Sequence, residues 1–464
     1  MEMTEKEVDE IIQPIQKTDL IYQIEDNPPF KEAAFAGLQH LLAIFVAIIT
    51  PPLIISKTLN FSAETTGFLV SMALLASGIS TFIQCRKFGP VGCGLLCVQG
   101  TSFSFIGALT ASFVAKGDMG EAAILAAIFG VCIAAAPVEM IVSRLLKYTK
   151  KIITPLVSGI VVTMIGLSLI KVAIISCGGG FGAMAIDPAV DSARSFGSIQ
   201  NLGLAALVLV SILILNSIRN KYVRMSSIII GLVIGYIVAY FMGWVDFSQM
   251  GDFGAVTIPQ PFKYGLGFDV SAFIAVALIY FITSIEAYGD ITANSMIGSE
   301  PIEGPKFMKR VQGGVLADGI NSAIAGVFNS FPNSIFAQNN GLIQLTGVAS
   351  RRVGYYIAGF LVILSAFPFV GGIFSIMPEP VLGGATLLMF GTVAASGVRI
   401  IASQNIDRKA ILVLAVSFAC GLGVELVPNI LSQMPATING IFSSGITTGG
   451  VVAIIANIVI RIKE

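Results

Sequence analysis

The chain has 464 residues, of which 55% are hydrophobic and 12% charged, and its 27 basic and 27 acidic side chains give a formal net charge of +0. A mean hydropathy of +0.87 indicates a membrane protein and excludes an ordinary water-soluble domain. The balanced, dispersed charge argues against a nucleic-acid partner. Residues 1–30 are polar and lack the apolar core of a signal peptide, so we expect a short cytoplasmic tail there.

Apolar segments long enough to cross a bilayer recur along the rest of the chain. They predict an all-α polytopic membrane protein with about fourteen transmembrane spans. Numbered 1 to 14, the expected spans are Ala36–Ser56, Phe68–Gln84, Val91–Val114, Glu121–Val142, Ile152–Val172, Leu202–Ile218, Met225–Met242, Val270–Ile285, Val311–Phe328, Ser334–Gly347, Val353–Phe369, Val381–Ile401, Ala410–Leu426 and Gly440–Ile460.

The basic residues test this count. With the N-terminus inside, 22 of the 27 Lys and Arg residues fall on the inner side. The five on the outer side are Lys57, Lys116, Lys171, Arg194 and Lys263. This bias follows the positive-inside rule and predicts that both termini are cytoplasmic.

Two expected spans are interrupted by polar residues. Span 3 carries the stretch Cys97–Phe105, and span 10 lies in the uncharged polar stretch Ser330–Gly347. Irregular backbone at membrane depth is tolerated only where protein or a water-filled cavity satisfies it, so we predict a solute site. The alternative, re-entrant loops without a solute role, stays open.

A weak internal repeat supports this prediction. Pro155 opens span 5 and Pro380 opens span 12, seven spans and 225 residues later. An odd offset inverts the two halves relative to each other, as in many secondary transporters. The same offset pairs span 3 with span 10.

Carboxylates at membrane depth are costly and usually functional. Glu286 follows the apolar run of span 8 and Asp318 lies inside span 9, so we expect both to exchange protons. A structural role stays open for each, and Asp318 could instead tie the broken spans together. We expect Asp290 to be a helix-end residue at the cytoplasmic edge, and Glu139 and Glu425 to be interface charges.

Neutral polar and aromatic side chains supply the rest of the expected site. An amide offers a donor and an acceptor together, which suits a neutral heterocycle. The candidate amides are Gln99, Gln338, Asn339 and Asn340, and the candidate aromatic wall is Phe103, Phe105 and Phe336. We expect His40 in span 1 to orient neighbouring groups.

The sequence does not favour metal binding, ATP-driven pumping or enzymatic catalysis. The six cysteines fall in or beside apolar spans and the only histidine is far away in sequence, so we expect inert thiols and no metal site. No phosphate-binding loop for ATP is present, and no nucleophile set indicates an enzyme. We expect no cofactor.

The run Gln338–Thr346 fits Q-N-x-G-x-x-x-x-T and resembles the signature of the nucleobase–ascorbate transporter (nucleobase–cation symporter 2) family. Supporting matches are Gln39-His40, Gln99–Phe103, Glu286 and Gly314–Gly319. The extension Gly347–Arg351 resembles the bacterial xanthine and uric acid permeases in particular. The resemblance covers essentially the whole chain after the tail.

The resemblance implies a seven-plus-seven inverted repeat, with short antiparallel strands in spans 3 and 10, in a homodimer in the cytoplasmic (inner) membrane. The core domain would comprise residues 31–145 and 266–375, which hold spans 1–4 and 8–11. The gate domain would comprise residues 146–265 and 376–464, which hold spans 5–7 and 12–14.

The resemblance also implies roles for single residues. Glu286 and Gln338 would bind the purine in a pocket lined by Gln99, Phe103, Ser104 and Ala337. Asp318 would be essential for transport, Asn339 would support coupling, and His40 would orient neighbouring groups. The remaining motif positions, expected to be structural, are Gly100, Thr101, Gly341 and Thr346. Many xanthine-specific relatives have Asn at the position of Ser104, so xanthine versus uric acid stays open.

These observations predict a proton-coupled symporter that imports xanthine, uric acid or both by alternating access, with lipid around it. Sodium coupling stays open, because hydroxyls such as Thr101 could ligate Na⁺. Other nucleobases, such as uracil, guanine or hypoxanthine, also stay open. So does an anion exchanger or channel of the same architecture, although spans 3 and 10 contain no basic residue. A transport-dead sensor is a further alternative.

Overall fold

The computed structural model describes residues 20–149, 154–184, 186–187, 191–220, 223–224, 226–247, 256–302, 304–336, 338–402, 404, 406–434, 442 and 444–460. Most of the expected N-terminal tail, the predicted site residue Ala337 and the side chain of Gln338 therefore lie outside the described part of the chain.

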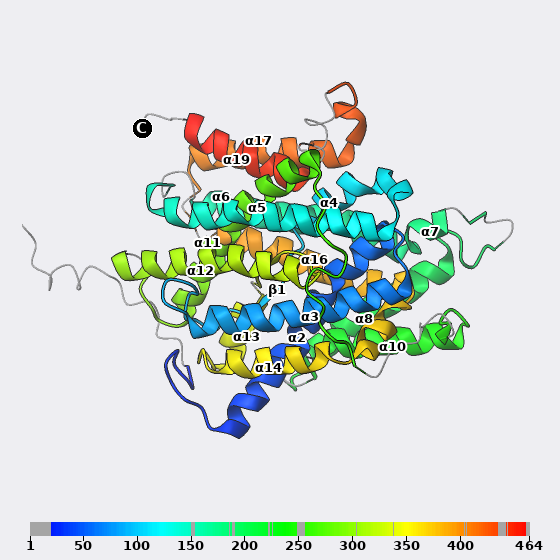
Figure 1. Cartoon of the computed structure of the whole chain (residues 1–464), viewed down its shortest axis with the longest axis horizontal. Helices are drawn as coiled ribbons and strands as arrows, with labels where there is room; N and C mark the ends of the chain where they lie inside the picture. Colours follow the sequence, from blue (N-terminus) through cyan, green and yellow to red (C-terminus); the bar gives the residue numbers. More distant parts are fainter. Residues whose placement is uncertain are drawn as a thin grey trace, which may run out of the picture.

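Long apolar helices dominate the structure and run roughly side by side (Figure 1). Within the described residues, eight helices are long and apolar enough to cross a membrane. They are α2 (Phe30–Thr58), α3 (Ala63–Arg86), α5 (Glu121–Thr149), α6 (Pro155–Cys177), α8 (Ile199–Ser217), α11 (Val270–Ile297), α16 (Glu379–Ala402) and α17 (Arg408–Leu426). The prediction of a helical membrane protein is therefore confirmed.

The other expected spans correspond to shorter, bent or more polar elements. The bent pair α14 (Val353–Ser365) and α15 (Pro368–Ser375) corresponds to span 11, and counting it as one span raises the described number to nine. Spans 7 and 14 correspond to the shorter helices α10 (Ser227–Phe241) and α19 (Gly445–Val459). Span 9 corresponds to α12 (Gly304–Val327), which carries basic residues at its start.

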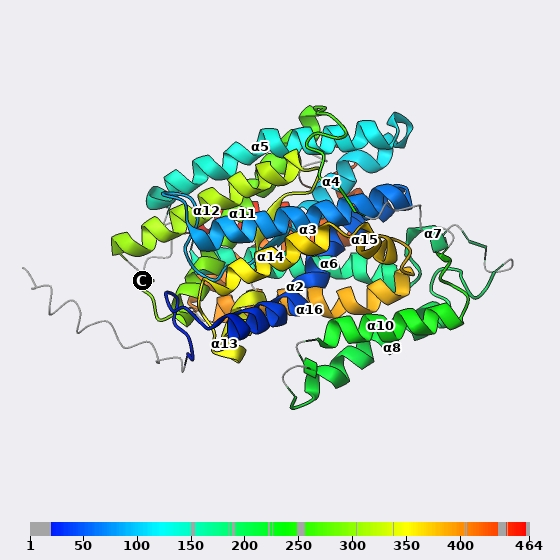
Figure 2. The ribbon, with the colours of Figure 1, turned by 60° about the horizontal axis from the view of Figure 1, so that its bottom comes forward.

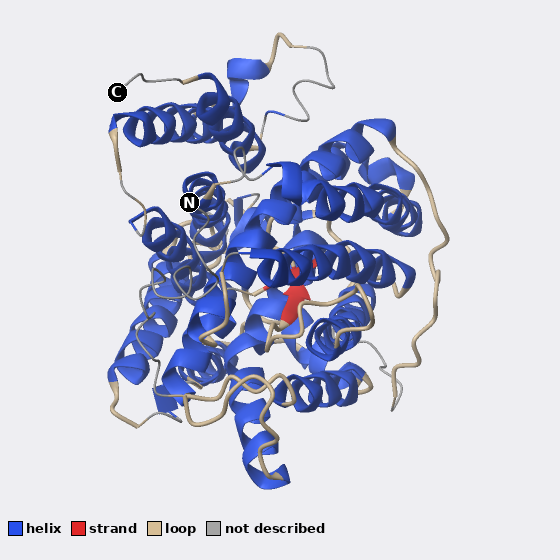
Figure 3. Ribbon diagram, turned by 90° about the vertical axis from the view of Figure 1, so that its left-hand side faces the viewer, coloured by secondary structure: helices blue, strands red, loops and turns tan. Residues whose placement is uncertain are grey.

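Spans 3 and 10 are not continuous helices. Strand β1 (Gln99–Thr101) leads into α4 (Phe105–Phe113), which η1 (Val114–Met119) follows, and strand β2 (Asn333–Ile335) precedes α13 (Gln338–Thr346). The strands pair antiparallel with Gly100 opposite Ser334. Every residue of both strands is buried, inside the bundle (Figure 3). The pairing satisfies backbone groups that could not be exposed to lipid.

Small residues bring the helices into close contact around this strand pair. Helices α6 and α16 pack along each other, as do α3 with α14 and α5 with α12. A Cβ added to Gly397 of α16 would lie 2.3 Å from the backbone N of Thr163 of α6. Such contacts explain why the chain is rich in glycine, since packing in lipid depends on close backbone approach.

Helices α8 and α10 lie together at one edge of the molecule (Figure 2). Large apolar side chains are exposed along both, among them Val210, Ile214, Val233 and Ile237. In a membrane protein, lipid or another protein surface covers such faces.

Candidate functional site

Asp318 is the hub of a buried polar cluster behind the strand pair. Its Oδ1 accepts hydrogen bonds from Nε2 of Gln99 on β1 and from Nε2 of Gln84 on α3, the latter at 3.0 Å. The Gln84 amide also donates to the Gly314 carbonyl, 3.0 Å away, and accepts from the Cys93 N–H at 2.9 Å. Asp318 thus connects α12 to α3 and to β1, the strand of interrupted span 3.

Glu286 faces the other end of β1. Ser104, which follows the strand, donates from Oγ to Glu286 Oε2 at 3.3 Å. A cavity of about 20 Å³ adjoins this pair. Its lining is Phe103, Val162, Ile165, Glu286, Ser334, Ile335, Phe336, Val393 and Ser396. The lining therefore combines β2 and the phenylalanines that follow the two strands with residues of α6, α11 and α16.

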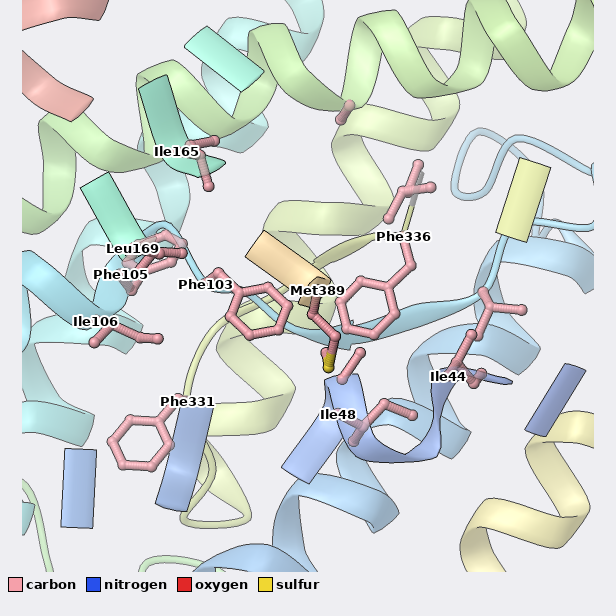
Figure 4. Close-up of a cluster of buried hydrophobic side chains, with 14 of the residues drawn as sticks. Ile44, Ile48, Phe103, Phe105, Ile106, Ile165, Leu169, Phe331, Phe336 and Met389 are labelled. Carbon is pink, nitrogen blue, oxygen red and sulfur yellow. The ribbon is translucent and has the colours of Figure 1, made fainter. Parts of the chain in front are cut away.

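Aromatic rings close one side of this cavity. Phe103 and Phe336 are stacked with ring centroids 6.2 Å apart, and Phe390 of α16 meets Phe103 edge-on at 5.3 Å. Figure 4 shows Met389 beside the two stacked rings. Two of the three expected aromatic residues therefore lie at the cavity, whereas Phe105 packs edge-on against Tyr280.

A second polar cluster lies at the start of half-helix α13. Asn339 Nδ2 donates to the Leu96 carbonyl at 2.6 Å, so its Oδ1 is free to contact Nδ1 of buried His40 at 2.7 Å. Asn294 of α11 donates to the same carbonyl and to Asn340 Oδ1, each at 2.9 Å. His40 and Asn294 thus hold the two adjacent amides of the motif.

The structural motif residues have distinct environments. A Cβ at Gly100 would lie 2.3 Å from Phe336 Cζ, whereas one at Gly341 would meet nothing within 4 Å. The hydroxyl of Thr346, the last residue of α13, donates to the Leu342 carbonyl at 2.8 Å, and Gly347, with φ +70°, follows the helix. Thr101 is fully buried, and its hydroxyl has no hydrogen-bond partner among the described residues.

Two sequence expectations about acids are wrong. Asp290 is 2% exposed because α11 continues to Ile297, so the residue is buried inside a helix and is not at its cytoplasmic end. Glu139 is 1% exposed and is not an interface charge, because α11 and α12 cover α5. Glu425, at the end of α17, accepts a hydrogen bond from the Gly445 N–H at 3.0 Å.

Three polar residues of these clusters were not predicted from the sequence. Gln84 binds Asp318, Thr81 accepts from the Gln99 N–H at 3.0 Å, and Asn294 binds Asn340. Gln84 and Thr81 are fully buried on α3, one turn apart. Their polarity within an apolar span was the available signal, since a buried amide needs partners.

The cysteines, expected from the sequence to be inert thiols, are the remaining candidates for metal ligands. Of the six cysteines, five are buried and Cys420 is half-buried, and all are free thiols. The described residues contain no group of three or more His, Cys, Asp or Glu side chains arranged to hold a metal ion.

The fold belongs to a class of helical membrane proteins in which two half-helices, each preceded by a short strand, meet inside the bundle. It is similar to the transmembrane domain of a cyanobacterial bicarbonate transporter, BicA, with a TM-score of 0.58 and 16% identity over 88% of this chain and 99% of that one. It is also similar to the murine Solute Carrier 26 family member A9 anion transporter in the inward-facing state, with a TM-score of 0.60 and 12% identity over 99% of this chain and 72% of that one.

Residues 31–430 match the family model described as "Permease family" (Xan_ur_permease), and the chain belongs to this family of nucleobase–ascorbate transporters. It is 48% identical to the xanthine permease XanP of Escherichia coli K12 over 96% of this chain and 95% of that one. It is 46% identical to XanQ of the same strain, over 96% and 94%. Identity to the uric acid permease PucJ of Bacillus subtilis 168 is 33%, over 92% of both. The family resemblance is confirmed, and the class is transporter rather than enzyme.

Proposed function

We propose that this protein is a proton-coupled symporter that imports an oxidised purine, xanthine and/or uric acid, across the cytoplasmic membrane by alternating access. The observation that carries the proposal is the carboxyl of Glu286, which accepts a hydrogen bond from Ser104 and lines a cavity between the strand pair and the neighbouring helices. The names of the relatives, xanthine and uric acid permeases, support the substrate class.

The chemistry of the cavity suits a flat heterocycle with N–H donors. Glu286 would accept hydrogen bonds from ring N–H groups, and the Ser104 hydroxyl can both donate and accept. Phe103 and Phe336 would offer faces for stacking. From the family motif, the Gln338 amide would add a paired donor and acceptor to the same ring, and Ala337 would leave room beside it.

The roles of the remaining site residues follow from their contacts. Asp318 would take up the coupled proton, and its bonds to Gln99 and Gln84 would transmit that change to β1. His40 and Asn339 would keep α13 oriented toward the substrate. Gly100, Thr101, Gly341 and Thr346 would serve the strand pair and half-helix as structural residues.

Helix packing supports an inverted seven-plus-seven repeat. Exchanging each of fourteen spans with the span seven positions away maps packed helix pairs onto packed pairs. The pair α3–α14 becomes α12–α5, α2–α3 becomes α11–α12, and α8–α10 becomes α17–α19, while α6–α16 and β1–β2 map onto themselves. The strand pair and α6–α16 would then lie on the pseudo-twofold axis.

The size of the cavity supports a moving core domain. Pockets that enclose small molecules are typically about 300–1,000 Å³, far above the 20 Å³ found beside Glu286. Helices α6 and α16 of the proposed gate domain (residues 146–265 and 376–464) contribute Val162, Ile165, Val393 and Ser396 to the lining. Substrate entry would require the core domain (residues 31–145 and 266–375) to shift against these residues, as in an elevator-type cycle.

The placement of Lys and Arg supports cytoplasmic N- and C-termini. The family resemblance supports a homodimer, in which exposed apolar helix faces would be covered by the second copy and by lipid.

An anion exchanger is the second candidate, favoured by the likeness of the fold to BicA and the murine anion transporter. The described lining of the cavity contains a carboxylate and no basic residue, which opposes an anionic solute. Sodium coupling is a variant for which the unpartnered Thr101 hydroxyl could serve as a ligand.

Uptake of radiolabelled xanthine and uric acid would test the proposal, in cells that lack their own purine permeases. We expect accumulation of at least one purine that collapses when a protonophore removes the proton gradient. Accumulation that survives the protonophore but needs Na⁺ would move the coupling to sodium. No uptake by protein shown to be in the membrane would contradict the proposed substrates, and the preferred purine would define the effect of Ser104.

A further inference from the structure

A third acid, Glu139 of α5, is buried in the core domain without a role in the proposed binding site. Its side chain is 1% exposed. Thr283 Oγ1 donates to its Oε1 at 3.2 Å, and Oε2 has no hydrogen-bond partner among the described residues. No ion pair in the described part of the chain includes it. Burying a carboxylate carries a desolvation cost that hydrogen bonds and ion pairs must offset. A carboxyl with a purely structural role would therefore be expected to have more partners than Glu139 has.

The position of Glu139 connects it to both site acids. Its partner Thr283 lies one helical turn before Glu286 on α11. On α12, a Cβ at Gly319 would lie 3.1 Å from the Met140 N and 3.2 Å from the Ala136 O, so the segment of α5 around Glu139 packs directly beside Asp318. Glu139 therefore lies at the junction of the two helices that carry Glu286 and Asp318.

The titratable groups facing Glu139 come from every helix packed around it. They are Asp318 of α12 and Glu286 and Tyr280 of α11. The Tyr280 hydroxyl already donates to the Cys132 carbonyl at 3.1 Å. Two of these groups, Asp318 and Glu286, are carboxyls like Glu139 itself.

We infer that Glu139 is a third member of the proton-coupling group, sharing the transported proton with Asp318 and Glu286. The inference rests on the proposed proton symport. Neighbouring carboxyls in a poorly polarisable interior cannot all be ionised, so protonation of one controls the others. One proton from the outer solution neutralises one carboxylate of the group, and the same proton leaves to the cytoplasm after substrate release. Glu139 would hold that proton away from the substrate.

Purified protein in liposomes would test this with two assays. Exchange of labelled for unlabelled xanthine at equal pH requires binding and domain movement but no proton gradient. Accumulation driven by an imposed pH gradient requires coupling. For Glu139→Gln, which keeps the side-chain shape and the acceptor for Thr283, we expect exchange within about twofold of the parent protein and accumulation reduced about tenfold or more.

Two further variants distinguish coupling from a structural effect. Thr283→Val removes the hydrogen bond but leaves the acid, and we expect it to retain gradient-driven accumulation. Glu64→Gln changes an exposed acid at the start of α3 and is expected to resemble the parent in both assays. Uric acid replaces xanthine as the label if uptake in cells prefers it.

The two assays distinguish a failure of proton symport from a failure of the role inferred for Glu139. A parent protein that exchanges purine but never accumulates it with a pH gradient would overturn proton symport, and with it the role of Glu139. If the parent accumulates purine and Glu139→Gln accumulates it equally, only the role of Glu139 is wrong. Loss of exchange together with accumulation in Glu139→Gln would show a structural role and would also overturn the inference.

Discussion

Gly100 and Gly341 are both motif glycines, but the structure gives them different roles. At Gly100 a side chain would collide with Phe336 and Ile48, because β1 passes directly over that ring. At Gly341 the space is open. The sequence motif placed both residues at the site, and only the contacts show that Gly100 has no room for a Cβ.

Gly100→Ala should therefore destabilise the protein, whereas Gly341→Ala is its matched control. Overpacking a tight site typically costs about 1–3 kcal/mol, and alanine is the better helix former at position 341. We expect a lower melting temperature of purified protein for Gly100→Ala only, together with weaker purine binding. Equal melting temperatures for the two variants would show that β1 can move away from Phe336.

Local sequence patterns predicted some helices and strands of the fold more accurately than others. Polar, turn-forming residues predicted the interruptions in spans 3 and 10, since they are poor in helix and rich in hydrogen-bonding groups. Helix α11 was predicted too short, ending at Ile285 instead of Ile297. Hydropathy falls where Glu286 and Asp290 appear, and it cannot distinguish a helix entering solvent from one entering a polar protein interior.

Asp269 caps the start of α11: it accepts a hydrogen bond from the Ala272 N–H at 2.9 Å and pairs with Lys116 at 2.5 Å. Partial burial acts to raise the pKa of Asp269, but the hydrogen bonds from Lys116 and the backbone outweigh it, and the pKa is lowered. A lowered pKa means that the stabilisation is present above about pH 4 and is lost as pH falls through the folded-state value.

Asp269→Asn should remove part of this acid sensitivity. The amide can still cap α11, but it neither ionises nor pairs with Lys116, so the melting temperature should fall less between pH 7 and pH 3.5 than in the parent. Asp407→Asn is the matched control, because Asp407 caps α17 at 2.7 Å and no ion pair among the described residues includes it. An unchanged pH dependence in Asp269→Asn would contradict this account. High salt should reduce the difference.

At the scale of the whole molecule, an ion pair connects the proposed core and gate domains. Lys57 at the end of α2 lies 3.2 Å from Glu379 at the start of α16 and donates to the Met377 carbonyl at 2.8 Å. A cavity of about 50 Å³ adjoins the pair and is also lined by Thr58 and Ser176. In the proposed topology these contacts hold the outer side closed.

Removing the charge of Lys57 should shift the protein toward the proposed outward-open conformation. A partly exposed ion pair contributes about 1 kcal/mol, or roughly a fivefold change in population. In Lys57→Gln, a cysteine introduced at Thr58 should react several-fold faster with a membrane-impermeant maleimide than in the parent background. Reversing both charges, with Lys57→Glu and Glu379→Lys together, should restore slow labelling. Equal labelling in all three proteins would show that the pair does not limit opening.

The sequence by itself determined the membrane class and the two interrupted spans, and it placed the carboxylates Glu286 and Asp318 at membrane depth. These are local properties, set by hydropathy, by helix-breaking residues and by the cost of a carboxylate in a bilayer. Only the tertiary structure decided which groups meet. Gln84 lies 234 residues from Asp318 and Ser104 lies 182 residues from Glu286, yet each pair is hydrogen-bonded. The burial of Glu139 was decided in the same way, because helices distant in sequence cover it and no local pattern reports such contacts.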